Sequence, residues 1–317
     1  MQPRPLPSGL GPGPFSSARA RELGVPSSRL RRGDLVHPTR GAHATSAPDT
    51  LTERATAYQA GMPSARAFSH RTAAHLWGVP LPGKEEPNGT TLLDVMAPTG
   101  DGMVIRRGAK GHRGLETRAV ATIPGTGLRV VDLADTWCDL GELKRGALSV
   151  GDLVVAADAV VAALDARAGR QVGIAMLRSA LAARVRPRGG INLRRALARA
   201  RHGVRSPMET RARLMFVDAG FPEPEVNAPL TDVAGEWLAE GDLVWRPQRV
   251  VGEYQGGHHA ERKRRSEDAF RRRLLEDQRW HVEELWAEDV RRGPRRRTTL
   301  LVFAHALGLD PCTLQIT

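Results

Sequence analysis

The last third of the chain alternates between helical and extended patterns of apolar positions. Runs with a three-to-four-residue period predict helices, and short runs rich in Val, Leu and Trp predict strands. The expected elements are a helix at 207–219, strands at 225–228, 235–245 and 249–255, a helix at 260–278, a strand at 280–285 and a helix at 298–307. This order predicts an α/β domain over 190–317, a mixed sheet flanked by helices.

The preceding residues predict two further regions and a tail. Residues 15–60 show two short helical segments and then two short extended runs, 35–38 and 41–44, the pattern of a winged-helix-like module. Residues 61–189 mix short strands, Gly-marked turns and helices, which predicts an α+β middle region. Residues 1–14 are rich in Pro and Gly, so we expect a disordered tail there.

The chain carries a formal net charge of +12, and arginine supplies nearly all of the excess, since only four of its 47 basic residues are lysine. Codon bias in a GC-rich genome explains such a composition, but so does a surface that binds phosphate. The crowding of arginine into the C-terminal part favours nucleic acid as the partner. The expected DNA-binding residues are Arg262, Lys263, Arg265 and Arg272.

The apolar runs and the cysteines indicate the cellular compartment of the protein. No apolar run reaches the length of about 18 residues that spans a bilayer, and the N-terminus lacks the pattern of a signal peptide. Cys138 and Cys312 stand far apart, and there is no CxxC pair. We therefore expect a cytoplasmic protein without a membrane partner, a disulfide framework or a zinc ribbon.

Two carboxylates stand at special positions in the predicted sheet. Asp242 begins one apolar strand, and Glu253 lies near the end of the next. If the turn at 246–248 joins these strands as an antiparallel pair, both carboxylates reach the same end of the sheet. Oxygen ligands of this kind suit Mg²⁺, which takes its remaining ligands from water and phosphate. Glu253 and Gln255 are two residues apart, so they share a face of the strand.

Three segments of this domain carry a family resemblance. They are SPME at 206–209, GDL at 241–243 and EYQGGHH at 253–259. In this order they resemble a domain of unknown function related to very-short-patch-repair endonucleases, within the PD-(D/E)XK nuclease superfamily. The resemblance implies a restriction-endonuclease-like fold and a metal-dependent DNA endonuclease, a hydrolase of phosphodiester bonds.

The resemblance also assigns roles to individual residues. Asp242 and Glu253 correspond to the ligands of Mg²⁺ or Mn²⁺, with the carbonyl of Tyr254 as a further ligand. Glu209 corresponds to the residue that orients metal-bound water. His259 corresponds to a general base or an acid for the leaving group.

Gln255 departs from the family pattern, which often has lysine or an acidic residue at this catalytic position. A lysine stabilises developing charge, whereas glutamine only forms hydrogen bonds. Glu209 also has a structural explanation, because Ser206, Pro207 and Glu209 form the start of a capped helix. The alternative function is therefore a non-catalytic DNA-binding regulator, an antitoxin-like repressor that retains the nuclease fold.

Residues 15–82 resemble the winged-helix region of AbiEi-type antitoxins, a looser match. The similarity lies in LRRGDL at 30–35, RG at 40–41 and the segment 69–82. It implies that the N-terminal module binds DNA or contacts a partner protein such as a toxin.

Overall fold

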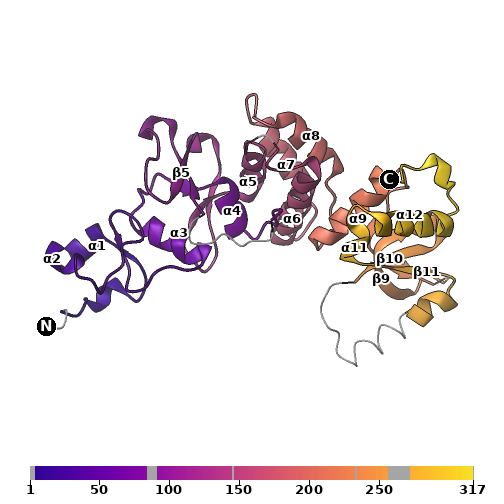
Figure 1. Cartoon of the computed structure of the whole chain (residues 1–317), viewed down its shortest axis with the longest axis horizontal. Helices are drawn as coiled ribbons and strands as arrows, with labels where there is room; N and C mark the ends of the chain where they lie inside the picture. Colours follow the sequence, from indigo (N-terminus) through magenta and orange to yellow (C-terminus); the bar gives the residue numbers. More distant parts are fainter. Residues whose placement is uncertain (1–3, 84–90, 145, 233, 256–271, 317) are drawn as a thin grey trace. The chain divides into compact units, whose positions relative to one another are not determined.

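The computed structural model describes the chain apart from residues 1–3, 84–90, 145, 233, 256–271 and 317. It divides into two compact units (Figure 1). One comprises Met1–Leu153 with Ala175–Arg195, and the other Val154–Ile174 with Ala196–Thr317. Each unit is described by itself.

The N-terminal part of the first unit is a small helical layer beside a two-stranded sheet. Helix α1 (Ser17–Glu22) begins where the side chain of Ser16 accepts a hydrogen bond from the backbone of Arg19. Strand β1 (Phe15–Ser16) pairs with β2 (Ala42–His43), and a single antiparallel bridge joins Val36 to Ala44. The two extended runs expected near 35–44 are thus bridged, but β2 completes its pairing with the chain before α1.

A small apolar cluster holds this layer together. Its buried members are Leu10, Phe15, Ala20, Val25, Leu30 and Leu35. Leu10 ends a short 3-10 turn (Ser8–Leu10) inside the stretch expected to be disordered, a contact that its Pro/Gly-rich composition does not predict. Helix α2 (Ser27–Leu30) supplies Leu30.

The middle of the first unit is a five-stranded mixed sheet in the order β5-β4-β3-β7-β6. Its strands are β3 (Ala67–Phe68), β4 (Leu93–Ala97), β5 (Ala109–Arg113), β6 (Val120–Thr122) and β7 (Arg129–Val131). Helices α3 (Leu51–Ala60), α4 (His70–Leu76) and α5 (Leu133–Leu140) accompany it. The apolar run at 103–105 is not a strand. Strand β4 pairs with β3 on one side and, on the other, with β5, whose residues Ala109–Arg113 carry no apolar alternation.

Three helices follow, and each has residues that belong to both units. They are α6 (Val150–Ala168), α7 (Gly173–Ala182) and α8 (Gly190–Arg199). In the second unit, Gly173 lies so close to the backbone of Val161 that an added Cβ would stand 2.7 Å from its Cα. A side chain at the start of α7 would therefore force these helices apart.

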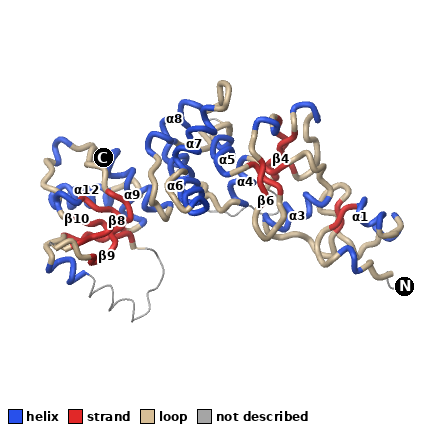
Figure 2. Tube along the Cα trace, turned by 180° about the vertical axis from the view of Figure 1, so that it is seen from behind, coloured by secondary structure: helices blue, strands red, loops and turns tan. Residues whose placement is uncertain are grey.

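The second unit is built on a four-stranded mixed sheet in the order β11-β10-β9-β8 (Figure 2). The strands are β8 (Glu225–Thr231), β9 (Trp237–Trp245), β10 (Val250–Tyr254) and β11 (His281–Leu285). The first three form an antiparallel meander, and β11 lies parallel to β10. The order of elements is the expected one, with the helix α9 (Pro207–Asp218) before the sheet and helical residues 272–277 before its last strand.

Apolar clusters lie on both faces of this sheet. On one face, Phe216 of α9 and Phe303 of α12 (Pro294–Ala306) pack with Trp245 of β9. On the other face, Leu275 and Trp280 pack with strand residues that include Val244 and Val251. The short helix α11 (Ala287–Val290) lies between β11 and α12 in the sequence. Apolar side chains thus cover both faces of the sheet. Polar residues at one level of the sheet are the exception.

With three sheets and helices throughout, the described chain is a mixed α/β protein. None of the helices in its described ranges combines the length and the apolar character needed to cross a bilayer.

Candidate functional site

Asp242 and Glu253 lie on the two strands of one hairpin. The 3-10 turn Arg246–Gln248 joins β9 to β10, and the antiparallel register pairs Gly252 with Leu243. One step further along this register, Asp242 stands opposite Glu253. Opposite residues of antiparallel strands have Cα atoms about 5 Å apart. This register confirms that the two carboxylates reach the same end of the sheet.

The carboxylate of Asp242 closes the ladder at this end. Its Oδ2 accepts a hydrogen bond of 2.8 Å from the backbone N–H of Tyr254, in the place where a strand carbonyl would otherwise accept. Glu253, between these neighbours, is 8% exposed and stands in register with Glu284 of β11. Strand register therefore places the pair at the end of the ladder that β9 and β10 form.

Hydrogen bonds hold Glu209 in place at the start of α9. The side chain of Ser206 caps the helix by accepting from the backbone N–H of Glu209 at 3.2 Å, with Pro207 in the first turn, as expected. Oε2 of Glu209 in turn accepts from the backbone N–H of Arg205 at 2.9 Å and from Nδ2 of Asn227 at 2.6 Å. Because Glu209 is 8% exposed, these contacts fix the direction of a nearly buried carboxylate.

Asn227 links Glu209 to the sheet. It lies on β8 between the pairs Val226–Leu243 and Ala228–Gly241, which puts it level with Asp242 on β9. Its φ of 47° is in the left-handed region that asparagine tolerates better than most residues. The irregular backbone turns a strand residue toward the helix, so that its amide reaches both Glu209 and the carbonyl of Gly203.

These registers place four polar residues in one row across the sheet. We call Asn227, Asp242, Glu253 and Glu284 the polar row. Glu209 joins the row at its β8 end through Asn227. At the β11 end, Oε1 of Glu284 accepts from Nη1 of Arg272 at 3.2 Å. Strand register therefore places polar side chains from all four strands at one level of the sheet.

Arg205 is the cation at the β8 end of the row. It forms a two-pronged ion pair with Glu240 of β9. The hydrogen bond that Arg205 donates to Glu240 raises the pKa of Arg205, and the nearby charges of Glu209 and Asp242 act in the same direction. Two of the expected site carboxylates, Glu209 and Asp242, thus interact electrostatically with Arg205.

The sequence did not identify Arg205, Asn227, Glu240 or Glu284 as site residues. Asn227 and Glu284 become neighbours of the carboxylate pair only through strand register, and Arg205 only through the fold of the loop before α9. The expected phosphate contact Arg272 is bound within the protein, to Glu276 at 3.0 Å as well as to Glu284. Both acids are about half exposed, so these contacts are weak enough to exchange for phosphate.

Gln255 directly follows the last residue of β10. Its backbone N–H donates to the carbonyl of Leu285 at 2.7 Å, and its side chain is half-buried. The expected residues His259, Arg262, Lys263 and Arg265 lie outside the described residues.

The ligands available for the implied metal are carboxylate oxygens. Among the residues that the structure describes, no three His, Cys, Asp or Glu side chains form a metal-binding group. The pair Asp242–Glu253 nevertheless offers only carboxylate oxygens, the hard ligands that Mg²⁺ and Mn²⁺ accept. A pair is compatible with Mg²⁺ because this ion usually keeps several waters and binds protein through one or two carboxylates.

Comparison with known proteins finds similarity over a limited part of the chain. The chain is 33% identical over 111 residues to an uncharacterised protein of Mycobacterium tuberculosis strain CDC 1551 / Oshkosh and, equally, to one of strain ATCC 25618 / H37Rv. The match spans 34% of this chain and 40% of each relative, so the chain covers less than half the length of these curated relatives. No family model and no solved structure matches the chain. It is thus similar to these mycobacterial proteins over about a third of its length.

Proposed function

We propose that the second unit is a metal-dependent DNA endonuclease with a restriction-endonuclease-like core. The observation that carries the proposal is the hairpin register that brings Asp242 and Glu253 to one end of a sheet, level with Asn227 and its partner Glu209. The order of helix, three-stranded meander, helical residues and parallel fourth strand agrees with the nuclease resemblance of the sequence.

In this proposal Asp242 and Glu253 hold Mg²⁺ or Mn²⁺, with the Tyr254 carbonyl as a further ligand. The bound ion supplies positive charge to the phosphate and makes a bound water more acidic. The hydrogen bond from Tyr254 keeps the Asp242 carboxylate oriented, and the contacts of Glu209 keep its carboxylate on the polar row so that it can orient water. Gln255 would contribute only hydrogen bonds, and His259 would serve the proton transfers.

DNA is the proposed partner of both units. Arg272 would exchange its exposed acidic partners for the phosphate backbone, with Arg262, Lys263 and Arg265 nearby in sequence. The N-terminal layer would serve as the winged-helix-like module that contacts DNA or a partner protein such as a toxin. In this proposal the protein acts in the cytoplasm.

The hydrogen bonds by which the same carboxylates stabilise the fold favour a second function. Asp242 completes the strand ladder, and Glu209 secures the chain around the start of α9. Together with Gln255, these contacts also fit a non-catalytic DNA-binding regulator, in which the carboxylates serve the fold alone. The two functions differ in whether the carboxylates are needed for cleavage.

A plasmid-nicking assay separates the two functions. With Mg²⁺ or Mn²⁺ we expect the native chain to nick supercoiled DNA, and we expect Asp242→Asn and Glu253→Gln to slow nicking by about 100-fold or more. The matched control is Asp277→Asn, which removes an exposed carboxylate of the same unit and should change nothing. Nicking that survives both site variants refutes the proposed centre. If the native chain does not nick but retards DNA in a salt-dependent manner, the regulator is the better description.

A further inference from the structure

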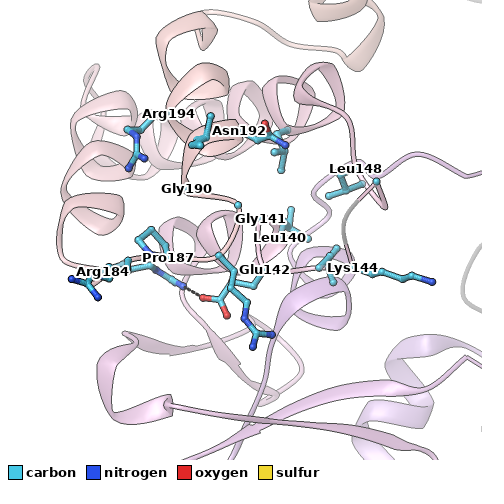
Figure 3. A pocket seen from close by; sticks show the side chains of 17 residues that line it. Leu140, Gly141, Glu142, Lys144, Leu148, Arg184, Pro187, Gly190, Asn192 and Arg194 are labelled. Carbon is cyan, nitrogen blue, oxygen red and sulfur yellow. Dashed lines mark hydrogen bonds and ion pairs between the residues drawn. The ribbon is translucent and has the colours of Figure 1, made fainter.

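A cavity in the first unit is separate from the polar row. It has a volume of about 960 Å³ and lies between the end of α5 and the start of α8 (Figure 3). All of its lining residues belong to segments 140–153 and 184–194, so it is formed within one compact unit. Its volume is within the range of small-molecule sites, about 300–1,000 Å³.

Close backbone packing fixes one wall of the cavity. At Gly189, where φ is 67°, an added Cβ would lie 2.1 Å from the carbonyl oxygen of Gly141. At Gly141, an added Cβ would lie 2.6 Å from the side chain of Leu193. Only glycine allows the loop before α8 to approach the end of α5 this closely. The hollow is therefore part of the fold rather than a gap left by a mobile side chain.

Positive charge surrounds the cavity without acidic partners. Lys144, Arg186, Arg188 and Arg194 line it with exposed side chains, and none of them forms an ion pair with another described residue. Figure 3 shows Arg194 and Lys144 on opposite sides of the hollow. Their long side chains are flexible enough to turn toward a bound anion.

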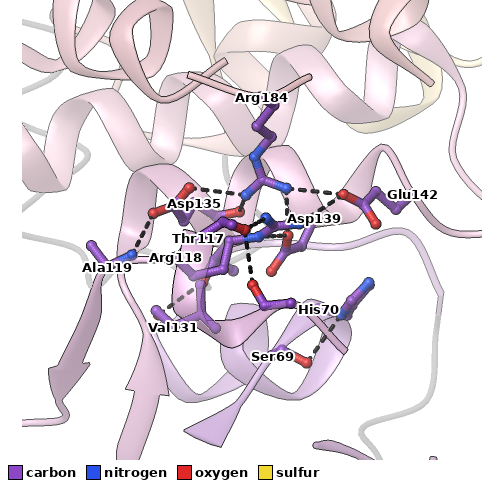
Figure 4. Close-up of polar contacts among 12 residues, drawn as sticks. Ser69, His70, Thr117, Arg118, Ala119, Val131, Asp135, Asp139, Glu142 and Arg184 are labelled. Atoms are coloured by element: carbon purple, nitrogen blue, oxygen red, sulfur yellow. Dashed lines mark hydrogen bonds and ion pairs between the residues drawn. The ribbon is translucent and has the colours of Figure 1, made fainter. Parts of the chain in front are cut away.

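The acids of a neighbouring ion-pair network are bound by arginine. Glu142, the one acidic residue among those that line it, accepts from Arg184 at 3.0 Å and from Arg118 at 2.9 Å (Figure 4). Arg184 also binds Asp139 at 2.7 Å and Asp135 at 3.0 Å. The three carboxylates of this network exceed its two guanidiniums by one charge, so the network offsets one of the four cations at the edge and leaves a formal net charge of +3.

The floor of the cavity is apolar. Leu140, Leu148 and Leu153 line it and are themselves at most 8% exposed. Asn192 stands at the edge and offers an amide that can both donate and accept hydrogen bonds. The site therefore combines an apolar surface, one adaptable polar group and four cations.

We propose that this cavity binds a free nucleoside polyphosphate. The polyphosphate chain concentrates three or four negative charges in a small volume, which matches the four cations, and arginine forks fit phosphate oxygens. The base would lie on the leucine floor, with Asn192 at its polar edge. A nucleic-acid strand is a poorer match, because it spreads one charge over each nucleotide and binds with aromatic stacking, whereas none of the lining residues is aromatic.

The test is titration of the full chain with adenosine, AMP, ADP and ATP, followed by calorimetry, and the same series for guanosine. We expect affinity to rise by about 10-fold or more from the monophosphate to the triphosphate. Arg188→Gln and Arg194→Gln should each weaken ATP binding by about 5- to 10-fold. Arg195→Gln is the matched control, since Arg195 is the next residue of α8, is exposed and does not line the cavity.

Several results would overturn the proposal. These are the absence of saturable binding at millimolar nucleotide, an affinity that does not depend on phosphate number, and equal effects of Arg194→Gln and Arg195→Gln. Displacement of ATP by a short single-stranded oligonucleotide at lower concentration would identify a phosphodiester strand as the occupant instead. Unfolding midpoints of the variants check that a lost affinity is not lost folding. The outcome is independent of DNA cleavage by the second unit.

Discussion

The backbone N–H of Tyr254 donates a hydrogen bond to Oδ2 of Asp242 across 2.8 Å, at the point where the β9–β10 ladder ends. The same carboxylate is a proposed metal ligand. One side chain thus has a structural contact and a proposed chemical role, and substitutions that differ in hydrogen-bonding ability separate them.

Asparagine and alanine at position 242 should have different effects on stability. Asp242→Asn keeps an oxygen that can accept from Tyr254, so we expect a small change in the free energy of unfolding. Asp242→Ala leaves a part-buried N–H without this acceptor, and we expect a loss of about 1–3 kcal/mol. Urea unfolding of both variants measures the difference. Equal stability of the two would show that the contact contributes nothing.

The same variants report on the metal. Binding to the native state alone stabilises it, so Mg²⁺ at concentrations above its Kd should raise the unfolding midpoint of the native chain. Asp242→Asn should abolish most of this rise while leaving the midpoint without Mg²⁺ nearly unchanged. A metal-induced rise that persists in Asp242→Asn would place the ion elsewhere.

The hairpin could be predicted from the sequence because the residues that indicate it are contiguous in the chain. A turn containing Pro247 between two apolar runs specifies an antiparallel pair, and the pair places Asp242 level with Glu253. Asn227 could not be predicted in the same way. Its neighbours arise from a left-handed backbone at one strand residue and from the register of β8 against β9, neither of which has a local sequence signal.

The buried polar clusters likewise could not be predicted from the sequence. The sequence does not indicate where His70 packs, and the structure shows it 2% exposed with its ring stacked on that of His112 at a centroid distance of 3.7 Å. Asp158 interrupts an apolar run of the sequence. In the structure it pairs with Arg213, 55 residues later, and both side chains are 1% exposed. Such pairings depend on long-range packing, which periodicity does not encode.

Position 227 should tolerate glycine better than valine. Glycine adopts a positive φ without strain, so Asn227→Gly removes only the amide contacts to Glu209 and Gly203. Asn227→Val adds a β-branched side chain to a left-handed backbone, and we expect a further loss of about 1–2 kcal/mol. Chemical unfolding of the two variants makes the comparison. If valine were as stable as glycine, the backbone at this residue would have to be extended.

Removal of Arg213 should be among the most damaging substitutions in the second unit. Arg213→Leu would leave Asp158 buried without its cation, which costs about 3–5 kcal/mol for pairs of this kind. The exposed pair Arg246–Glu225 provides the control, since Arg246→Leu should cost about 1 kcal/mol or less. Replacing both members, as Asp158→Asn with Arg213→Met, should recover part of the loss. Denaturant midpoints that rank the two leucine variants equally would contradict this account.

His70 should make the first unit sensitive to acid. Burial lowers the pKa of His70 from 6.5 to about 3, and the neighbouring His112 adds to this, while Asp94, which pairs with His112 at 2.8 Å, opposes it. The folded state therefore holds His70 neutral where the unfolded chain binds a proton, so stability falls as the pH drops below about 6.5 and continues to fall toward pH 3. The slope is about 1.4 kcal/mol per pH unit, or about 2 kcal/mol lost by pH 5.

Asparagine at position 70 tests this expectation, because it tolerates the φ of 48° found there and does not titrate. Opening free energies of the β4 amides, from hydrogen exchange corrected for intrinsic rates, should fall by about 2 kcal/mol between pH 7 and pH 5 in the native chain. His70→Asn should lower the value at pH 7 and flatten its dependence on pH. An unchanged slope would show that another group binds the proton, and His43, whose pKa is lowered by burial and by His37, is then the next histidine to substitute.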